Sequence, residues 1–209
     1  MKKTIITIER QYGSGGSAIG RLTAEKLGVK YYNRQILEMT AERCGMSPEY
    51  LESADENVPT SFLYSLLLSA NPARTMEENL PLSDKVFLME SRIINEIADK
   101  EKSFVLVGRC GNYILEERGC FSVYIYADTK SRIQRAINDY GIDENKAESI
   151  MKKADKRRET FYNVNTGGAW QDKEQYALCL NSAMLGDEMC AEIIVRAYNE
   201  YNRMFADKE

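Results

Sequence analysis

Short β-rich runs recur along the chain, and the segments between most of them are long enough for helices. Residues 4–8 (TIITI), 104–107 (FVLV) and 123–126 (VYIY) are apolar or β-branched almost throughout, which is typical of strands covered on both faces. Residues 176–180 (YALCL) and the shorter 29–32 (VKYY) bring the set to five. Strands that alternate with helices predict right-handed crossovers and a parallel sheet, so the expected fold class is α/β.

Capping residues indicate where several helices begin and end. The helix that starts near Gly16 is expected to end at Gly28, because glycine suits the left-handed residue that follows a helix. Ser47 and Pro48 predict another start, with a hydroxyl cap followed by a proline in the first turn. A later helix is expected to open at Asp143, where acidic charge favours the helix N-terminus.

The chain is predicted to form a single domain over residues 1–209. Residues 57–82 hold three of the four prolines around an apolar run at 62–68, and we expect a helical insertion there. Residues 139–175 lie between the last two predicted strands and are expected to form a lid region.

Composition narrows the possible chemistry. The 209 residues include 28 Lys and Arg against 32 Asp and Glu, a net charge of −4, and no histidine. Without histidine, a Ser-His-Asp hydrolase, a His-ligated zinc or haem and imidazole acid–base catalysis are excluded. A mildly acidic chain also argues against a nucleic-acid partner, because sequence-independent binding of that kind needs a basic face.

Cysteine usage and hydropathy bear on the compartment. The five cysteines are Cys44, Cys110, Cys120, Cys179 and Cys190. Their odd number and the absence of C-x-x-C spacing favour reduced, buried thiols and a reducing cytosol. No apolar run approaches the length of a membrane span, so we expect a cytoplasmic protein with no membrane partner. The sequence leaves a homo-oligomer open.

A glycine-rich turn follows the first strand and precedes a helix. Residues 10–20 read RQYGSGGSAIG, and amides without Cβ crowding can wrap around a phosphate at a helix N-terminus. The predicted set for binding phosphate and ATP is Arg10, Gly13, Ser14, Gly15, Gly16 and Ser17. The hydroxyl of Ser17 is the candidate Mg²⁺ ligand. The alternative is a plain glycine-rich connection that binds nothing.

The turn departs from the P-loop pattern G-x-x-x-x-G-K-[ST] at two positions. Gly16 stands where the lysine is expected, and Arg10 stands at the first glycine. Phosphoryl transfer needs positive charge beside the phosphates, so arginines at strand ends become candidates. Arg10 follows the first strand, and Arg109 follows strand 104–107 after one glycine. In a parallel sheet, both arginines lie at the carboxyl edge.

Basic residues gather between the last two predicted strands. Arg132 and Arg135 are three residues apart and share a helix face. Residues 152–158 (KKADKRR) hold five positive charges and one negative charge. The alternatives are a solvated helix face and a helical hairpin that folds over nucleotide phosphates. Asp155 is a candidate to hold one of the arginines, and Trp170 is favoured as a packing anchor over a base-stacking platform.

Taken in order, these motifs resemble those of the cytidylate kinase-like family, in the superfamily of P-loop nucleoside monophosphate kinases. The similar segments are residues 10–20, 27–33, 107–110, 153–162, 166–170 and 176–186. The resemblance implies a three-layer P-loop kinase fold, with a five-stranded parallel sheet of order 2-3-1-4-5, flanking helices and a helical lid. It also implies Mg-ATP as phosphate donor and a pyrimidine monophosphate as acceptor.

The same resemblance assigns roles to individual residues. The catalytic set is Arg109, Arg132, Arg135, Lys153, Asp155 and Arg158, and the acceptor-binding set is Asn33, Arg34 and Arg109. Asp155 and Arg158 match a D-x-x-R pair in the lid. Besides Gly16, the sequence departs from the family pattern at Cys110 and Asn33, which stand where aspartates are expected.

Three functions from different classes remain open. The main prediction is a kinase that moves the ATP γ-phosphate to a nucleoside monophosphate or a similar small phosphorylated acceptor. An acceptor phosphate oxygen is already a nucleophile, so this reaction needs no histidine base. The alternative is a regulatory P-loop protein that binds a nucleotide without turnover; it is favoured by Gly16, and Gly16→Lys is expected to add activity. A structural or assembly role rests only on the apolar run 62–68.

Overall fold

Five parallel strands form a sheet in the order β2-β3-β1-β4-β5. The computed structural model describes residues 4–54 and 82–206. The strands are β1 (Thr4–Arg10), β2 (Lys30–Tyr32), β3 (Ser103–Val107), β4 (Phe121–Tyr126) and β5 (Leu178–Asn181). Every neighbouring pair runs parallel. The predicted fold class and strand order are confirmed.

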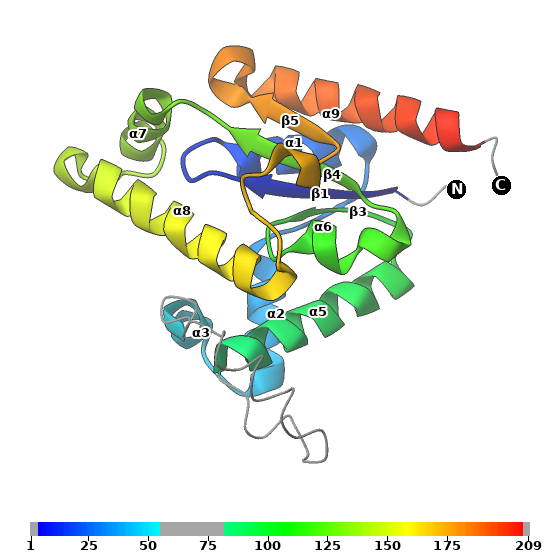
Figure 1. The fold of residues 1–209 in the computed structure, drawn as a ribbon, viewed down its shortest axis with the longest axis horizontal. Coiled ribbons are helices and arrows are strands. Elements are labelled where there is room, and N and C mark those ends of the chain that lie inside the picture. The colour runs from blue at the N-terminus through cyan, green and yellow to red at the C-terminus, as the bar shows by residue number, and fades with distance from the viewer. Residues whose placement is uncertain (1–3, 55–81, 207–209) are drawn as a thin grey trace.

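Helices connect the strands and cover both faces of the sheet (Figure 1). They are α1 (Gly16–Leu27), α2 (Arg34–Cys44), α3 (Pro48–Ala54), α5 (Leu82–Lys100), α6 (Gly111–Ile114), α7 (Thr129–Asn138), α8 (Glu144–Thr166) and α9 (Ser182–Ala206). Two 3₁₀ turns, η2 (Glu116–Arg118) and η3 (Lys173–Gln175), come shortly before β4 and β5.

The capping residues act as the sequence indicates. Gly28 is left-handed, with φ 63°, and its amide donates back into the last turn of α1. The hydroxyl of Ser47 accepts a hydrogen bond from the amide of Tyr50 in α3. The carboxylate of Asp143 accepts one from Asn145 at the start of α8. These helix boundaries are therefore set by local chemistry that is visible in the sequence.

The last strand begins two residues later than the pattern at 176–180 predicts. The amide of Tyr176 donates within the η3 turn, and the amide of Ala177 donates to the hydroxyl of Ser122 at 3.0 Å. Because both amides are used in this way, the ladder with β4 starts only at Leu178. The predicted start is wrong because a local turn competes with the strand.

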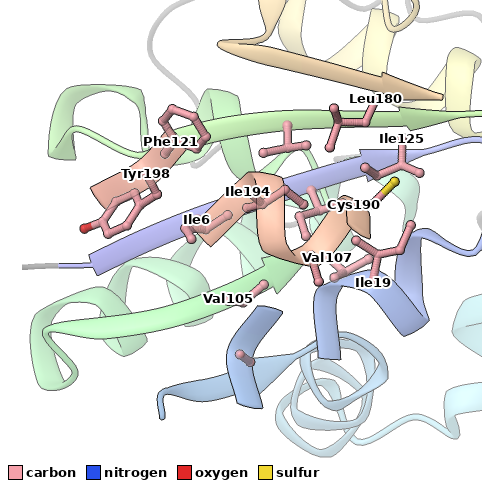
Figure 2. Packing of buried hydrophobic residues seen from close by; sticks show 14 residues of the cluster. Ile6, Ile19, Val105, Val107, Phe121, Ile125, Leu180, Cys190, Ile194 and Tyr198 are labelled. Atoms are coloured by element: carbon pink, nitrogen blue, oxygen red, sulfur yellow. The ribbon is translucent and has the colours of Figure 1, made fainter. Parts of the chain in front are cut away.

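One core lies between the sheet and the pair α1 and α9 (Figure 2). Ile6 and Ile8 of β1 meet Ile19 of α1 and Ile194 of α9 there, and all four side chains are fully buried. Side chains alternate along a strand, so Ile5 points to the opposite face and packs against α2 and α5. Burial on both faces explains why the run at 4–8 is apolar without interruption.

Another cluster of buried residues lies beside α8 and includes Trp170. The Trp170 side chain is 1% exposed, and its ring meets the ring of Tyr124 in β4 edge to face, with the centroids 5.6 Å apart. Tyr162 of α8 and Cys110 after β3 belong to the same cluster. Trp170 is a packing anchor, as the sequence analysis favours.

Some expectations fall outside the described residues. They concern the helical insertion predicted at 57–82, of which only Leu82 is described, and the apolar run at 62–68. Within residues 4–54 and 82–206, no helix combines the length and the apolar character that crossing a membrane would need.

Replacement of a core residue on α9 measures how much the helix layer contributes to stability. Ile194→Ala is expected to lower the free energy of unfolding by about 2 to 5 kcal/mol, because it leaves a cavity in the core between α9 and the sheet. Met184→Ala is the matched control on the same helix, since Met184 is 82% exposed, and it should change stability by less than about 0.5 kcal/mol. Urea unfolding followed by circular dichroism measures both; equal effects would contradict this packing.

Candidate active site

The carboxyl ends of β1, β3 and β4 meet at one edge of the sheet, where the hairpin of α7 and α8 also lies (Figure 1). Arg10 ends β1 and pairs with Ile125 in the ladder with β4. The amide of Gly108 donates to the carbonyl of Ile8 at 2.9 Å, which extends the pairing of β1 with β3 past the strand end. The parallel sheet therefore brings Arg10 beside the turn that carries Arg109, as the sequence predicts.

The loop between β1 and α1 has the conformation of an anion-binding turn. Gly13 and Gly15 have positive φ values of 76° and 77°, which glycine adopts without strain. Among the described residues, the amides of Gly13, Gly15, Gly16 and Ser17 have no backbone or side-chain acceptor. Four such donors at the N-terminus of a 12-residue helix suit the oxygens of a phosphate.

Neighbouring arginines occupy the space beside two of these glycines. An ideal Cβ on Gly13 would lie 2.6 Å from the carbonyl oxygen of Arg132, and one on Gly15 would lie 1.5 Å from Nη1 of Arg135. Residues 13–16 are accordingly buried. Glycine is needed at both positions for space as well as for φ.

Gly16 and Ser14 play parts that differ from the sequence prediction. Gly16 lies in the first turn of α1 and does not have a positive φ, so the backbone conformation at this position does not itself require glycine. Ser14 is fully buried, and its hydroxyl donates to the carbonyl of Gln11 at 2.8 Å. Its own carbonyl accepts a 2.6 Å hydrogen bond from Ser182 of α9. The side chain of Ser14 therefore stabilises the loop from within.

The carboxylate of Asp155 joins α8 to this loop. Its Oδ1 accepts a 2.7 Å hydrogen bond from the amide of Tyr12, and its Oδ2 pairs with Nη1 of Arg132. Arg132 also donates to the carbonyl of Tyr12 at 3.3 Å, so the three residues form a closed ring of contacts. The side chains of Arg132 and Asp155 are only 8% and 14% exposed. The prediction that Asp155 holds one of the arginines is confirmed.

Arg158 meets the loop one helical turn further along α8. Its Nη1 donates to the carbonyl of Arg10 at 3.0 Å, and its guanidinium carbon lies 5.8 Å from the ring centroid of Tyr12. Burial, and then the charge of Arg10, lower the pKa of Arg158 to about 9. Burial and the charge of Arg109 also lower the pKa of Arg10, against the opposing effect of Glu9. Positive charge is thus crowded at this edge of the sheet.

A cavity of about 460 Å³ opens between the loop, the turn after β3 and helix α8. It is lined by Glu9, Arg10, Tyr12, Arg109, Cys110, Ala154, Arg157, Arg158, Phe161 and Tyr162. Four of these lining residues are arginines and one is a carboxylate, Glu9. Glu9 is 5% exposed and accepts a 3.1 Å hydrogen bond from the indole of Trp170. A lining with this charge excess and this volume suits a small anionic ligand.

The turn after β3 is strained in a way that directs Arg109. Arg109 and Cys110 have positive φ values of 61° and 53°, which are uncommon for residues with side chains. Arg109 lines the cavity, and its Nη1 lies 2.9 Å from Oε1 of Glu90, a fully buried residue of α5. The ion pair with Glu90 fixes the direction of the guanidinium.

Arg135 pairs with a different carboxylate from Arg132. Its guanidinium donates to both oxygens of Asp187, at 2.8 and 3.2 Å. Gly186, with φ 75° and ψ 161°, interrupts α9 just before Asp187. Oδ1 of Asp187 lies 2.8 Å from an ideal Cβ on Gly15. The helix face that Arg132 and Arg135 share is therefore joined to α8 by one ion pair and to α9 by another.

The sequence pattern that defines the cytidylate kinase-like family matches residues 5–184. The chain belongs to this family. The cytidylate kinase of Archaeoglobus fulgidus is 26% identical over 198 residues, which cover 92% of this chain and 93% of that one. The cytidylate kinase of Sulfurisphaera tokodaii is 25% identical over 192 residues, covering 91% and 92%.

Solved structures share the fold of this cytidylate kinase-like protein. An uncharacterized protein from Eubacterium ventriosum superposes with a TM-score of 0.71 at 22% identity, over 94% of this chain and 99% of that one. Shikimate kinase from Acinetobacter baumannii, solved with shikimate, gives 0.53 at 15% identity, over 96% and 95%. At these identities the likeness shows the P-loop kinase fold and nothing finer.

Some of the site residues predicted from the sequence of this protein lie outside the cavity. Lys153 is exposed on α8 and does not line it. The side chain of Arg34 is 60% exposed and lies 3.5 Å from Glu38 on its own helix. Asn33 donates to the hydroxyl of Ser17 at 3.4 Å, so these two residues lie together at the start of α1 and α2. The structure does not bring Lys153 or Arg34 together with the other predicted residues.

Several residues at the site were missed by the sequence analysis. They are Tyr12, Arg157, Phe161 and Tyr162 in the cavity, Glu90, which pairs with the cavity residue Arg109, and Asp187, which pairs with Arg135 outside the cavity. The α8 residues had a usable signal, because positions 154, 157, 158 and 161 share one helix face. Glu90 and Asp187 had none, since each meets its arginine only through the tertiary fold.

Loss of the Asp155 charge is expected to destabilise the protein. Asp155→Asn leaves Arg132 shielded without a counterion, which should cost about 3 to 5 kcal/mol in the free energy of unfolding. Glu148→Gln on the same helix is the control, because Glu148 and its partner Lys152 are largely exposed, and no measurable change is expected. Chemical denaturation of both variants measures the difference. A loss no larger than the control's would show that the pair does not hold α8 to the loop.

The crowded arginines should make the protein sensitive to anions. Sulfate is expected to raise Tm by at least about 3 °C over chloride at equal ionic strength, because an anion that binds only the folded state stabilises it. Arg158→Gln should remove more than half of this rise. Arg118→Gln should keep it, because Arg118 pairs with Asp99 and does not line the cavity. Equal shifts in all three proteins, measured by differential scanning calorimetry, would mean that the cavity does not bind the anion.

Proposed function

We propose that this cytidylate kinase-like protein is a phosphotransferase that moves the γ-phosphate of Mg-ATP to the phosphate of a small acceptor. A nucleoside monophosphate, with CMP first, is the proposed acceptor class. The observation that carries the proposal is the arginine-lined cavity next to a loop with four unpaired amides. Family membership and the kinase fold support the same reaction.

The two halves of the site divide the work between donor and acceptor. The four unpaired amides, those of Gly13, Gly15, Gly16 and Ser17, suit the β-phosphate of the donor, because they lie at the positive end of α1. Arg109 and Arg157 line the cavity and suit the phosphate of the acceptor, since a guanidinium binds phosphate through two parallel hydrogen bonds. An acceptor oxygen then attacks the γ-phosphorus, and the leaving β-phosphate oxygen keeps the bond electrons. Positioning and charge stabilisation carry such a reaction, so no side-chain base is required.

Helix α8 supplies charge and excludes water. Asp155 and Arg158 bind the loop backbone on either side of Gln11, so α8 covers the cavity in this structure. We propose that residues 139–175, which include α8, form the lid, and that its closure brings Arg158 to the phosphates. Arg132 and Arg135 position the lid through their ion pairs, whereas Lys153 contributes only long-range charge.

The residues present fit a magnesium ion that arrives with the nucleotide. Ser17 supplies a hydroxyl oxygen at the start of α1, and the side-chain amide of Asn33 is beside it. Among the described residues, no group of three acidic or cysteine side chains could hold a resident metal. Mg²⁺ commonly takes one or two protein ligands, with phosphate oxygens and water completing its shell. When bound, the ion neutralises charge on the β- and γ-phosphates.

A coupled assay of ADP formation with Mg-ATP tests the proposal over CMP, dCMP, UMP and other monophosphates. Arg109→Gln is expected to lower kcat/KM for the best acceptor by about 100-fold or more, because a phosphate ligand is lost from a shielded site. Arg118→Gln is the control and should leave kcat/KM unchanged. If the folded wild-type protein forms no ADP with any acceptor of the panel, the proposed kinase activity is contradicted.

A nucleotide-binding regulatory protein is the second candidate. The amide of Tyr12 donates to the Asp155 carboxylate, and Gly16 stands at the usual lysine position. Both features favour binding of a nucleotide without turnover. Calorimetric binding of ATP with no ADP formed, in the presence of every acceptor of the panel, would select this function.

A further inference from the structure

We infer that the guanidinium of Arg10 takes the place of the P-loop lysine, and that a side chain at position 16 and Arg10 exclude each other. The inference rests on the proposed function, in which the loop and the cavity bind phosphoryl groups. It explains the two departures from the P-loop pattern together: the positively charged side chain is at position 10 and not at position 16, and the glycine is at position 16 and not at position 10.

The steric part follows from the space beside Gly16. An ideal Cβ on Gly16 would lie 2.4 Å from Cβ and 2.8 Å from Cγ of Arg10. These atoms are the base of the Arg10 side chain, held by the pairing of β1 with β4, so they cannot move away as a flexible tip would. Because φ at Gly16 is ordinary, space is the reason for glycine here. A lysine at 16 therefore requires a small residue at 10.

The side chain of Arg10 extends from Gly16 to the turn after β3. An ideal Cβ on Gly108 would lie 2.1 Å from Nη1 of Arg10. Glycine at 108, with φ 79°, therefore leaves room for the guanidinium beside Arg109. Arg10 lines the cavity along with Arg109, so its charge lies between the phosphate loop and the acceptor side. In the proposed reaction, the γ-phosphoryl group moves from the donor at the phosphate loop to the acceptor, and so passes Arg10.

The guanidinium of Arg10 is poorly compensated by protein groups. Its Nε is out of contact with solvent and has no hydrogen-bond partner. Among the described residues, its one counterion is Glu9, whose Oε2 lies 3.9 Å from Nη1 and already accepts a hydrogen bond from Trp170. A structural arginine at this depth would be expected to use its donors on carbonyls or carboxylates. Because Arg10 lines the cavity and its counterion is as far as 3.9 Å away, the guanidinium suits an anionic ligand, and its planar shape allows it to bind two oxygens at once.

The space beside Gly16 argues against a gain of activity in Gly16→Lys alone. The new side chain would start inside the volume of Arg10. We expect Gly16→Lys to lower Tm and to lose activity, and Arg10→Gly to lose about 100-fold in kcat. The double variant Arg10→Gly/Gly16→Lys should recover at least about tenfold over Arg10→Gly, because it recreates the usual pairing of glycine and lysine. Additive losses in the double variant would overturn the inference.

Two further variants separate charge from packing. Arg10→Met keeps an unbranched side chain of similar length without its charge, and Arg10→Lys keeps the charge. Isothermal calorimetry with inorganic pyrophosphate is the readout. We expect Arg10→Met to weaken pyrophosphate binding by at least tenfold with little change in Tm, and Arg10→Lys to recover most of the affinity. Wild-type affinity in Arg10→Met would show that Arg10 does not bind phosphate and would overturn the inference.

Failure of the proposed function gives a different result. If the wild-type protein transfers phosphate to no acceptor, the kinase proposal fails, while pyrophosphate binding by the Arg10 variants still decides the role of Arg10. If Gly16→Lys does not fold but Arg10→Gly/Gly16→Lys does, the steric exclusion is supported directly. If Gly16→Lys folds and binds pyrophosphate as tightly as the wild-type protein, the exclusion is wrong.

Discussion

The carboxylate of Asp155 is the point at which the basic helix and the phosphate loop become one structure. Through a single side chain, α8 holds the amide of Tyr12 and the guanidinium of Arg132. The pair is shielded from solvent, so the attraction is stronger than on a surface, and removing either partner would leave a buried charge. Together with the hydrogen bond from Arg158 to the carbonyl of Arg10, this contact holds α8 over the strand ends beside the cavity.

This contact also explains how so many arginines can lie close together. Three of the arginines form ion pairs: Arg132 with Asp155, Arg135 with Asp187, and Arg109 with Glu90. The cavity lining keeps an excess of positive charge, because it holds Arg10 and Arg158 with two further arginines and a single carboxylate, Glu9. A phosphoryl ligand would supply the missing negative charge, so the same arrangement serves binding and folding.

The glycines of the loop are required for two different reasons, backbone conformation and space. Gly13 and Gly15 are fixed by backbone conformation, and arginines also close the space beside them. Gly16 has ordinary helical geometry and is fixed by the base of the Arg10 side chain alone. A loop that lacks the usual lysine is therefore a different solution for placing charge, in which the strand end supplies the cation in place of the helix.

Local chemistry in the sequence determined the strands and the helix caps, whereas the order of the sheet came from the resemblance to a family. Ile5, Ile6 and Ile8 indicate burial on both faces, Gly28 and Ser47 mark helix ends, and the motif order indicated the family and hence the strand order. The pairing of Asp155 with an arginine was also predicted, because Asp155 is the one acidic residue in the basic run 152–158. The exposed position of Lys153 could not be predicted, since membership in a charge run does not say which side of a helix meets the sheet.

Only the tertiary structure decided which groups face the cavity. Glu90 and Asp187 reach their arginines from helices far along the chain, and no spacing rule connects them. The closeness of Gly16, Arg10 and Gly108 likewise depends on the packing of two strand ends against the start of α1. Composition and pattern fix what a segment can form by itself, whereas a site made of side chains from several segments depends on distances that only the assembled fold sets.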